Sequence, residues 1–351
     1  MRGKLLFVLV VVSLLAAACM PPATPVPPAA APAPAEEEKA GGYRIGLVVK
    51  NLGNPFFEAV NRGAQEAAKE LGDEVIFQGP ATPTAEGQIE IIDALIAQRV
   101  DAIAVTANDP EALVPVGKKA MNAGIKMVTF DSAVAPEGRQ LFVNQADMEQ
   151  IGRIQVQMLA EMINYEGEIA ILSAASTMTN QNTWIEWMKK ELEDPKYSKM
   201  KLVAIVYGDD LREKSYNEAQ GLFKSYPNLK GIISPTTVGI AATARALQDA
   251  GLCGKIALTG LGLPSEMAEY IKNGCCQEMA LWNPIDLGYL TVYATHALLD
   301  GKITGKPGET FQAGRLGEYT TQDEGNGGVM VLLGPPFRFN AENIDEWAQV
   351  Y

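Results

Sequence analysis

From residue 43 onward the chain alternates short runs of β-branched and aliphatic residues with amphipathic segments, and this alternation constrains the fold most. The first apolar run covers residues 44–49, and a helical pattern follows over residues 56–71. Asn54 is a preferred N-cap and Pro55 suits the first turn of that helix. Strands that alternate with helices predict parallel sheets with right-handed crossover connections. The pattern therefore indicates an α/β fold of the doubly wound kind.

The alternation runs twice, which indicates two lobes instead of one large sheet. The first series ends with a short strand over residues 141–143, and the second begins with a helix over residues 150–164. Later elements are a helix over 287–299 and strands over 278–281, 314–319 and 329–332. A chain that finishes both lobes with such leftover elements crosses between them more than once, and several crossings make a hinge. We expect a first lobe of residues 43–146 plus 283–312 and a second of residues 147–282 plus 313–351.

The N-terminal residues predict export and attachment to a membrane. Two basic residues precede an almost unbroken apolar run over residues 5–18, too short to span a bilayer core that takes about 20 helical residues. We interpret residues 1–18 as a signal peptide. Small residues followed by Cys19 resemble a bacterial lipobox, which implies lipidation of that cysteine. Residues 19–42, rich in Pro and Ala, predict an extended tether; the alternative is an ordinary secreted protein with a Pro-rich N-terminus.

Composition disfavours several classes of partner. The chain has 29 basic and 42 acidic residues, whereas nucleic-acid affinity comes largely from basic side chains that neutralise phosphates. The four cysteines show no CxxC or Cys/His spacing typical of a metal site. We therefore expect no nucleic acid, no metal and no cofactor. A disulfide between Cys253 and either Cys275 or Cys276 is compatible with an oxidising compartment, and the pairing stays open.

Enzymatic activity is also disfavoured. His296 is the only histidine, and its apolar helical surroundings predict a structural role, so the commonest acid–base residue is nearly absent. A secreted glycosidase would need two carboxylates about 5–9.5 Å apart. Asp131 with Asp109 or Asp209 shows no recognisable spacing of that kind. A transcriptional repressor with the same lobes would need an N-terminal DNA-reading module, where this chain has a signal and a tether.

Polar residues gather just after the expected strands, in both halves of the chain. These residues are Lys50, Asn51, Asn54, Asn108, Asp109, Asp131, Thr179, Asn180, Gln181, Thr236, Thr237, Trp282 and Asn283. Ligands of open α/β sheets bind beyond the carboxyl ends of the strands. Amides, hydroxyls, one lysine and carboxylates suit a neutral polyhydroxy ligand, and Phe56, Phe57 or Trp282 would cover its C–H faces. Structural alternatives remain: Asn54 is an N-cap, and Asp209 and Asp210 are typical capping residues before a helix.

The motifs resemble a known family. Residues 50–57 (KNLGNPFF) resemble the first strand-to-helix turn of bacterial sugar-binding proteins of the ribose-binding type, which serve ABC importers. Further stretches resemble the rhamnose-binding proteins of that group: TNQNTW (179–184), VYGDDL (206–211), KSYPN (224–228), SPTTVG (234–239), TGLGLPSEM (259–267) and LWNPIDLGY (281–289). The resemblance covers residues 43–351. It implies a type I periplasmic binding protein, in which a three-strand hinge joins two lobes and the ligand lies in the cleft.

The resemblance also implies roles for single residues. Asp131 matches the carboxylate that the family uses to bind sugar hydroxyls, while Asn54 and Trp282 match other cleft contacts. Ser132 and Gly262 stand where ribose binders carry Arg and Asp, so the resemblance argues against ribose.

The autoinducer-2 receptor is a similar rival. It shares the positions of Lys50, Asp131, Gln181 and Pro235, but it has Asp in place of Asn180 and Ala in place of Thr237. An amide in place of a carboxylate changes charge and acceptor count, so this ligand ranks second.

We therefore expect an exported, lipid-anchored, monomeric solute-binding protein, and not an enzyme. It would capture rhamnose or a related deoxyhexose by hinge closure and present it to an ABC permease. The alternatives are an autoinducer-2 receptor or a binding protein for another monosaccharide. The expected ligand-binding residues are Lys50, Asn54, Phe56, Asp131, Asn180, Gln181, Pro235, Thr237, Trp282 and Asn283.

Overall fold

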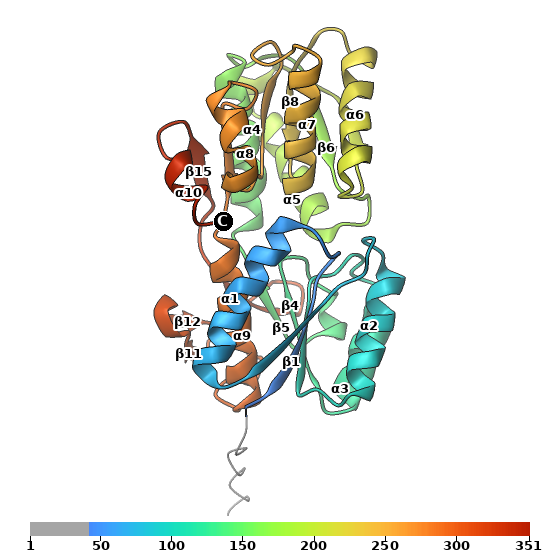
Figure 1. Ribbon diagram of the computed structural model, residues 1–351, viewed down its shortest axis with the longest axis vertical. Helices are drawn as coiled ribbons and strands as arrows, with labels where there is room; N and C mark the ends of the chain where they lie inside the picture. The colour runs from blue at the N-terminus through green and yellow to red at the C-terminus, as the bar shows by residue number, and fades with distance from the viewer. Residues whose placement is uncertain (1–41) are drawn as a thin grey trace, which may run out of the picture. The chain divides into compact units, whose positions relative to one another are not determined.

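The computed structural model describes residues 42–351, which form two lobes with a sheet in each (Figure 1). The predicted α/β class and the two-sheet organisation are confirmed. The expected signal peptide, Cys19 and nearly all of the expected tether lie outside the described residues. Among residues 42–351, no helix is both long and apolar enough to cross a lipid bilayer.

The first lobe is built on a seven-stranded sheet. Its strands are β1 (Arg44–Val48), β2 (Glu74–Gln78), β3 (Ala102–Val105), β4 (Lys126–Phe130), β5 (Leu141–Asn144), β13 (Gln322–Asp323) and β14 (Val329–Leu332). Their order is β13-β14-β5-β4-β3-β1-β2, and all neighbours are parallel except β13 and β14. Because the central strands are parallel, the loops that follow them lie at one edge of the sheet.

Helices cover both faces of this sheet, which explains why its strands are apolar at successive positions. These helices are α1 (Pro55–Leu71), α2 (Ala85–Ala97), α3 (Val114–Asn122) and α9 (Pro284–Leu299). Along β1, Ile45 and Leu47 belong to the core under α1 and α9, and Val48 belongs to the core under α2 and α3. Gly46 lies so close to α2 that a Cβ there would come 2.6 Å from Leu95 Cδ1, so a side chain would push the helix away.

The second lobe has a four-stranded parallel sheet in the order β7-β6-β8-β9. Its strands are β6 (Glu166–Ser173), β7 (Lys199–Tyr207), β8 (Leu229–Ser234) and β9 (Ala257–Gly260), and β10 (Glu278–Leu281) pairs with β15 (Phe337–Asn340) beside them. The helices are α4 (Met148–Met162), α5 (Thr179–Leu192), α6 (Arg212–Ser225), α7 (Thr237–Asp249), α8 (Pro264–Lys272) and α10 (Ile344–Trp347). Helices α4 and α5 pack against each other on one face of the sheet. Helices α6 and α7 pack against each other on the opposite face.

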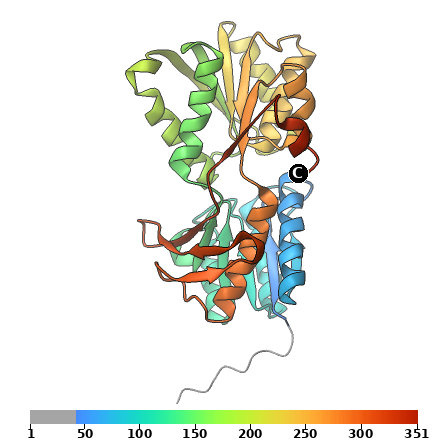
Figure 2. The ribbon, with the colours of Figure 1, turned by 90° about the vertical axis from the view of Figure 1, so that its left-hand side faces the viewer.

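The chain passes between the lobes three times, after β5, after β10 and after β14 (Figure 2). The expectation that residues 313–332 belong to the second lobe is wrong, because β14 pairs with β5 and extends the first sheet. The third passage therefore lies between Leu332 and Phe337. The strand expected over 314–319 is also wrong. Instead, the antiparallel strands β11 (Thr310–Gln312) and β12 (Glu318–Thr320) form a hairpin, and the 3₁₀ helix η3 (Gly314–Leu316) lies between them. Two further 3₁₀ helices are η1 (Pro136–Gly138) and η2 (Pro195–Tyr197).

The described cysteines and the histidine lie outside the cleft and make contacts within the fold. Cys253 forms a disulfide with Cys275, which decides the pairing that the sequence left open. Cys276 keeps a free, buried thiol, and burial raises its pKa to about 12. His296 Nδ1 lies 2.8 Å from Asp73 Oδ2, at the side of the first lobe. The structural role expected for this histidine agrees with that contact.

Candidate functional site

Side chains from both lobes enclose a cavity at the edges where the parallel strands end. It is lined by Lys50, Asn54, Phe56, Phe57, Asp131, Asn180, Gln181, Trp184, Asp210, Pro235, Thr236, Thr237, Leu261, Leu281 and Trp282. Nine of the ten residues expected from the sequence are among them; the exception is Asn283. The cavity volume open to water is about 40 Å³. That is room for about three water molecules, so a sugar ring enters only when the lobes move apart.

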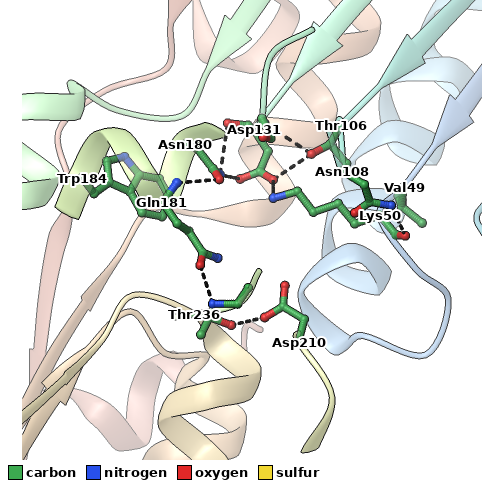
Figure 3. Close-up of polar contacts among 12 residues, drawn as sticks. Val49, Lys50, Thr106, Asn108, Asp131, Asn180, Gln181, Trp184, Asp210 and Thr236 are labelled. Carbon is green, nitrogen blue, oxygen red and sulfur yellow. Dashed lines mark hydrogen bonds and ion pairs between the residues drawn. The ribbon is translucent and has the colours of Figure 1, made fainter. Parts of the chain in front are cut away.

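A buried ion pair lies at the centre of the cavity (Figure 3). Lys50 Nζ is 2.9 Å from Asp131 Oδ2, and both side chains are at most 5 % exposed. Asp131 has a φ of +57°, an uncommon conformation for a residue with a side chain, directly after β4. This backbone is held by a hydrogen bond from Asp131 N to Val143 O. Local strain of this kind is typical of ligand sites, because the surroundings must fix one side-chain direction.

A layer of buried polar groups positions this pair. Thr106 Oγ1 donates to Asp131 Oδ2 at 2.8 Å. Gln88, fully buried on α2, donates to Val49 O at 3.1 Å and to Thr106 O at 2.7 Å. Its side chain thereby ties the ends of β1 and β3 together, immediately beside Lys50 and Thr106. Pre-organised groups of this kind do not have to be ordered again when a ligand binds.

The second lobe reaches the ion pair through the first turn of α5. Asn180 Nδ2 donates to Asp131 Oδ1 at 3.1 Å, and Asn180 Oδ1 accepts from Gln181 N at 2.8 Å (Figure 3). Gln181 Oε1 accepts from Ser173 Oγ at 2.7 Å and Ala174 N at 2.8 Å. The contact between Asn180 and Asp131 joins the two lobes across the cleft.

Aromatic side chains form an apolar wall of the cavity. The Trp282 ring lies 6.0 Å from Phe56 and 5.8 Å from Trp184, centroid to centroid. Trp282 Nε1 is buried without a hydrogen-bond partner, so this residue offers a donor as well as a ring face. Trp184 also lines the cavity, and its Nε1 lies 2.9 Å from Met148 Sδ.

Asn283 is a correction. It is the N-cap of α9, and its Oδ1 accepts from Ile285 N at 2.9 Å and Asp286 N at 3.3 Å. Its side chain is committed to the helix and does not line the cavity. Asn54 does both: its Oδ1 accepts from Phe56 N at 3.0 Å, and the residue borders the cavity.

Sequence reasoning missed several cavity residues. Leu261 follows β9 and Leu281 is the last residue of β10, and their apolar character gave no signal. Asp210 follows β7 and Thr236 follows β8; Thr236 was among the polar residues gathered after the expected strands but not among the expected ligand-binding residues. Helix capping was the structural alternative for Asp210, but α6 has Leu211 at its N-cap and no side-chain cap bond. Its position after a strand was the signal that pointed to the cavity.

Comparison with known proteins identifies the family. Residues 45–303 match the model of the periplasmic binding protein domain. The chain belongs to the periplasmic binding protein family. A solved structure of an ABC transporter solute-binding protein from Clostridium phytofermentas with bound L-rhamnose is 42 % identical, with a TM-score of 0.87 over 89 % of this chain and 100 % of that chain.

More distant family members are also similar. A D-ribose/D-allose-binding protein of Pseudomonas aeruginosa is 29 % identical over 66 % of this chain and 74 % of its own length. The structure of LsrB from Clostridium saccharobutylicum in complex with AI-2 has a TM-score of 0.83 at 24 % identity, over 87 % of this chain and 99 % of that chain, and shows the shared fold. The type I fold expected from the sequence is thus confirmed.

The cavity supplies hydrogen bonds and apolar surface. Within the part of the chain that the structure describes, no group of three or more His, Cys, Asp or Glu side chains is arranged to hold a metal ion. What the lining offers is a paired carboxylate, amide and hydroxyl groups, an indole donor and aromatic faces. These groups recognise a small neutral molecule rich in hydroxyls.

Proposed function

We propose that this protein captures L-rhamnose or a related deoxyhexose and delivers it to an ABC permease. The observation that carries the proposal is the contact of Asn180 with Asp131, which puts groups of both lobes around one carboxylate. A carboxylate has about four acceptor sites, and Lys50, Thr106 and Asn180 occupy three of those of Asp131, so a sugar hydroxyl donates to the remaining site in a charge-assisted bond of about 1.5–3 kcal/mol. The similarity to the L-rhamnose-bound protein supports the choice of sugar.

Hinge closure is the proposed mechanism. Lys50 and Asp131 belong to the first lobe, and Asn180, Gln181 and Thr237 to the second, so a sugar contacts all of them only when the cleft is shut. A ligand shifts such an open–closed equilibrium by its difference in affinity for the two states. A micromolar dissociation constant corresponds to about −8 kcal/mol, which a few charge-assisted bonds and one covered ring face supply.

The apolar lining favours a deoxyhexose over a fully hydroxylated hexose. Phe56, Trp184 and Leu281 border the cavity and offer no hydrogen-bond partner to a hydroxyl at C6, apart from an indole N–H that already contacts Met148. A methyl group at C6 fits against such side chains, whereas an unpaired hydroxyl there costs its lost water contacts.

Asn180 disfavours autoinducer-2 as the ligand. An aspartate at this position, as in the receptor that the sequence resembles, would place a second carboxylate against Asp131 where Asn180 now donates a hydrogen bond. The amide instead stabilises the carboxylate that the proposed sugar uses.

We further propose that the protein works outside the cytoplasmic membrane, held by lipid at Cys19, as a monomeric binding protein and not an enzyme. Members of the family matched here are solute-binding proteins. Replacing Cys19 with Ser should release the protein from the membrane fraction of expressing cells, which immunoblotting of the fractions would detect. Retention of the variant at the membrane would contradict the anchor.

The decisive experiment is a ligand panel. Thermal-shift and calorimetric titrations with L-rhamnose, L-fucose, D-ribose, D-galactose and autoinducer-2 should give the tightest binding with L-rhamnose. Equal or tighter binding of D-ribose or autoinducer-2 would overturn the assignment, and no heat with any of them would overturn sugar capture itself.

A further inference from the structure

A second carboxylate faces the cavity. Asp210 lies between β7 and α6, is 8 % exposed and lines the cavity together with Lys50 and Asp131. Thr236 Oγ1 donates to Asp210 Oδ1, while the other carboxylate oxygen points toward the space below Lys50 (Figure 3). No ion pair of Asp210 is found among the described residues. A buried carboxylate with spare acceptor capacity is costly unless something donates to it.

The backbone is arranged to aim this side chain inward. Asp209 and Asp210 have φ values of +54° and +52°, so two successive residues with side chains adopt the left-handed conformation. Asp209 turns outward, is about two-fifths exposed and pairs with Lys214. The loop is pressed against α6, since a Cβ at Gly208 would meet Ser215. Consecutive residues in this conformation persist only where the surroundings enforce them, and here the packing of the loop against α6 fixes the direction of Asp210.

The helix-capping explanation does not account for Asp210. Helix α6 has no side-chain cap bond at its N-terminus. The hydroxyl of Thr236 comes from the loop before α7, and this residue also makes no cap bond to its own helix. The two side chains therefore hydrogen-bond to each other at the cavity, and neither of them caps a helix.

The charges around the cavity are unequal. Lys50 is the only basic residue in the lining, and it is already paired with Asp131. Burial raises the pKa of Asp210, and the negative charges of Asp131 and Asp209 act in the same direction; Lys50 and the bond from Thr236 oppose them. An ionised Asp210 thus gives the closed cavity an excess of negative charge.

We propose that Asp210 contacts the ligand and determines selectivity: its free oxygen accepts a sugar hydroxyl, and its charge excludes anionic sugars. The role rests on the proposed sugar-binding function and defines the ligand class as neutral hydroxylated molecules, with sugar acids and sugar phosphates rejected. Because Asp210 belongs to the second lobe, its bond to a sugar held by Asp131 forms only on closure.

The test compares Asp210→Asn with Asp209→Asn, which removes the neighbouring carboxylate from the same loop and the same backbone conformation. Asparagine adopts positive φ readily, so both variants should fold, as circular dichroism would verify. Calorimetry with L-rhamnose should give at least about tenfold weaker binding for Asp210→Asn, the loss of one charge-assisted bond, and a change within about twofold for Asp209→Asn. Competition with L-rhamnonate should show that Asp210→Asn discriminates against the anion at least about fivefold less than the unmodified protein.

Each result is informative. Equal L-rhamnose affinity and equal discrimination in the two variants would overturn the role of Asp210 and leave sugar capture standing. No binding of any sugar by the unmodified protein would overturn both proposals. Thr236→Val provides a second route, since it removes the donor that holds Asp210 and should weaken L-rhamnose binding by a smaller factor; unchanged binding in this variant would contradict the inferred arrangement.

Discussion

The two lobes present different chemistry to the cleft. The first lobe holds a complete network, in which Lys50, Asp131 and Thr106 satisfy one another. The second lobe presents groups that point into the cleft: Asn180 donates to Asp131 of the first lobe, and one oxygen of Asp210 has no hydrogen-bond donor among the described residues. The first lobe is therefore ready to receive a ligand, while the contacts of the second lobe are completed only by closure.

The lobes also differ in how they are stabilised. The first sheet has seven strands and the second has four, with the disulfide between Cys253 and Cys275 in the second lobe. A smaller sheet buries less apolar surface, and a cross-link offsets this by restricting the unfolded chain. In the second lobe, the cross-link that stabilises the fold is thus distinct from the residues that line the cavity.

The largest effect on binding is expected from Asp131→Ala. It removes the shared carboxylate and leaves Lys50 buried without its partner, a change typically costing about 3–5 kcal/mol, so L-rhamnose affinity should fall roughly 100- to 1000-fold or more. Glu90→Ala, on the exposed side of α2, is the control and should bind as before. Calorimetry that finds wild-type affinity for Asp131→Ala in a folded protein would remove the first lobe from its central role.

A smaller effect is expected from Asn180→Asp, which challenges the second lobe. The new carboxylate would face Asp131 Oδ1, now 3.1 Å from Asn180 Nδ2, and repulsion would oppose closure. We expect about ten- to 100-fold weaker L-rhamnose binding at pH 7. Asn217→Asp makes the same charge change at an exposed position of α6 outside the cavity and should leave affinity intact. Tighter binding in Asn180→Asp would show that the cross-cleft bond does not hold the closed form.

The sequence predicted the first lobe better than the end of the chain. Periodicity and caps located α1 within one residue of its start, because Asn54 and Pro55 signal a helix locally. Nothing local reveals that β14 returns to β5, since sheet pairing depends on contacts distant in sequence.

Prediction of the site had a similar limit. Residues after strands could be collected from the sequence because parallel strands bring their carboxyl ends together. Sequence position alone does not decide which polar side chain turns inward. Asn283 and Asp210 illustrate this: the asparagine expected to bind the ligand caps α9, and the aspartate for which helix capping was the alternative lines the cavity. The direction of each side chain depends on backbone angles, such as the positive φ of Asp210, that no motif encodes.

The buried carboxyl of Asp210 in the second lobe should make closure of the cleft depend on pH. Burial raises the pKa of Asp210: above that raised pKa the group stays ionised in the closed cleft, whereas closing takes up a proton and is favoured as pH falls through it. Small-angle scattering without sugar should therefore give a smaller radius of gyration at pH 5 than at pH 7. The Asp210→Asn variant should lose this pH dependence and should already be compact at pH 7. The charged groups that act on this position, Lys50, Asp131 and Asp209, are unchanged in the variant. A pH dependence that persists in the variant would assign the effect to another group.

The smallest effect on binding is expected from removing the disulfide. Cys253 precedes β9 and Cys275 precedes β10, whereas the cavity residues Leu261 and Leu281 lie at the opposite ends of those strands. The double replacement of both cysteines by Ser should lower the free energy of unfolding by about 3 kcal/mol in guanidinium titrations, the value expected for a closed loop of this size. L-rhamnose affinity should change less than about twofold, because the cross-link restricts the unfolded chain and not the cleft. A large loss of affinity without loss of stability would mean that the cross-link orients the second lobe's contacts, and the separation of fold from binding there would fail.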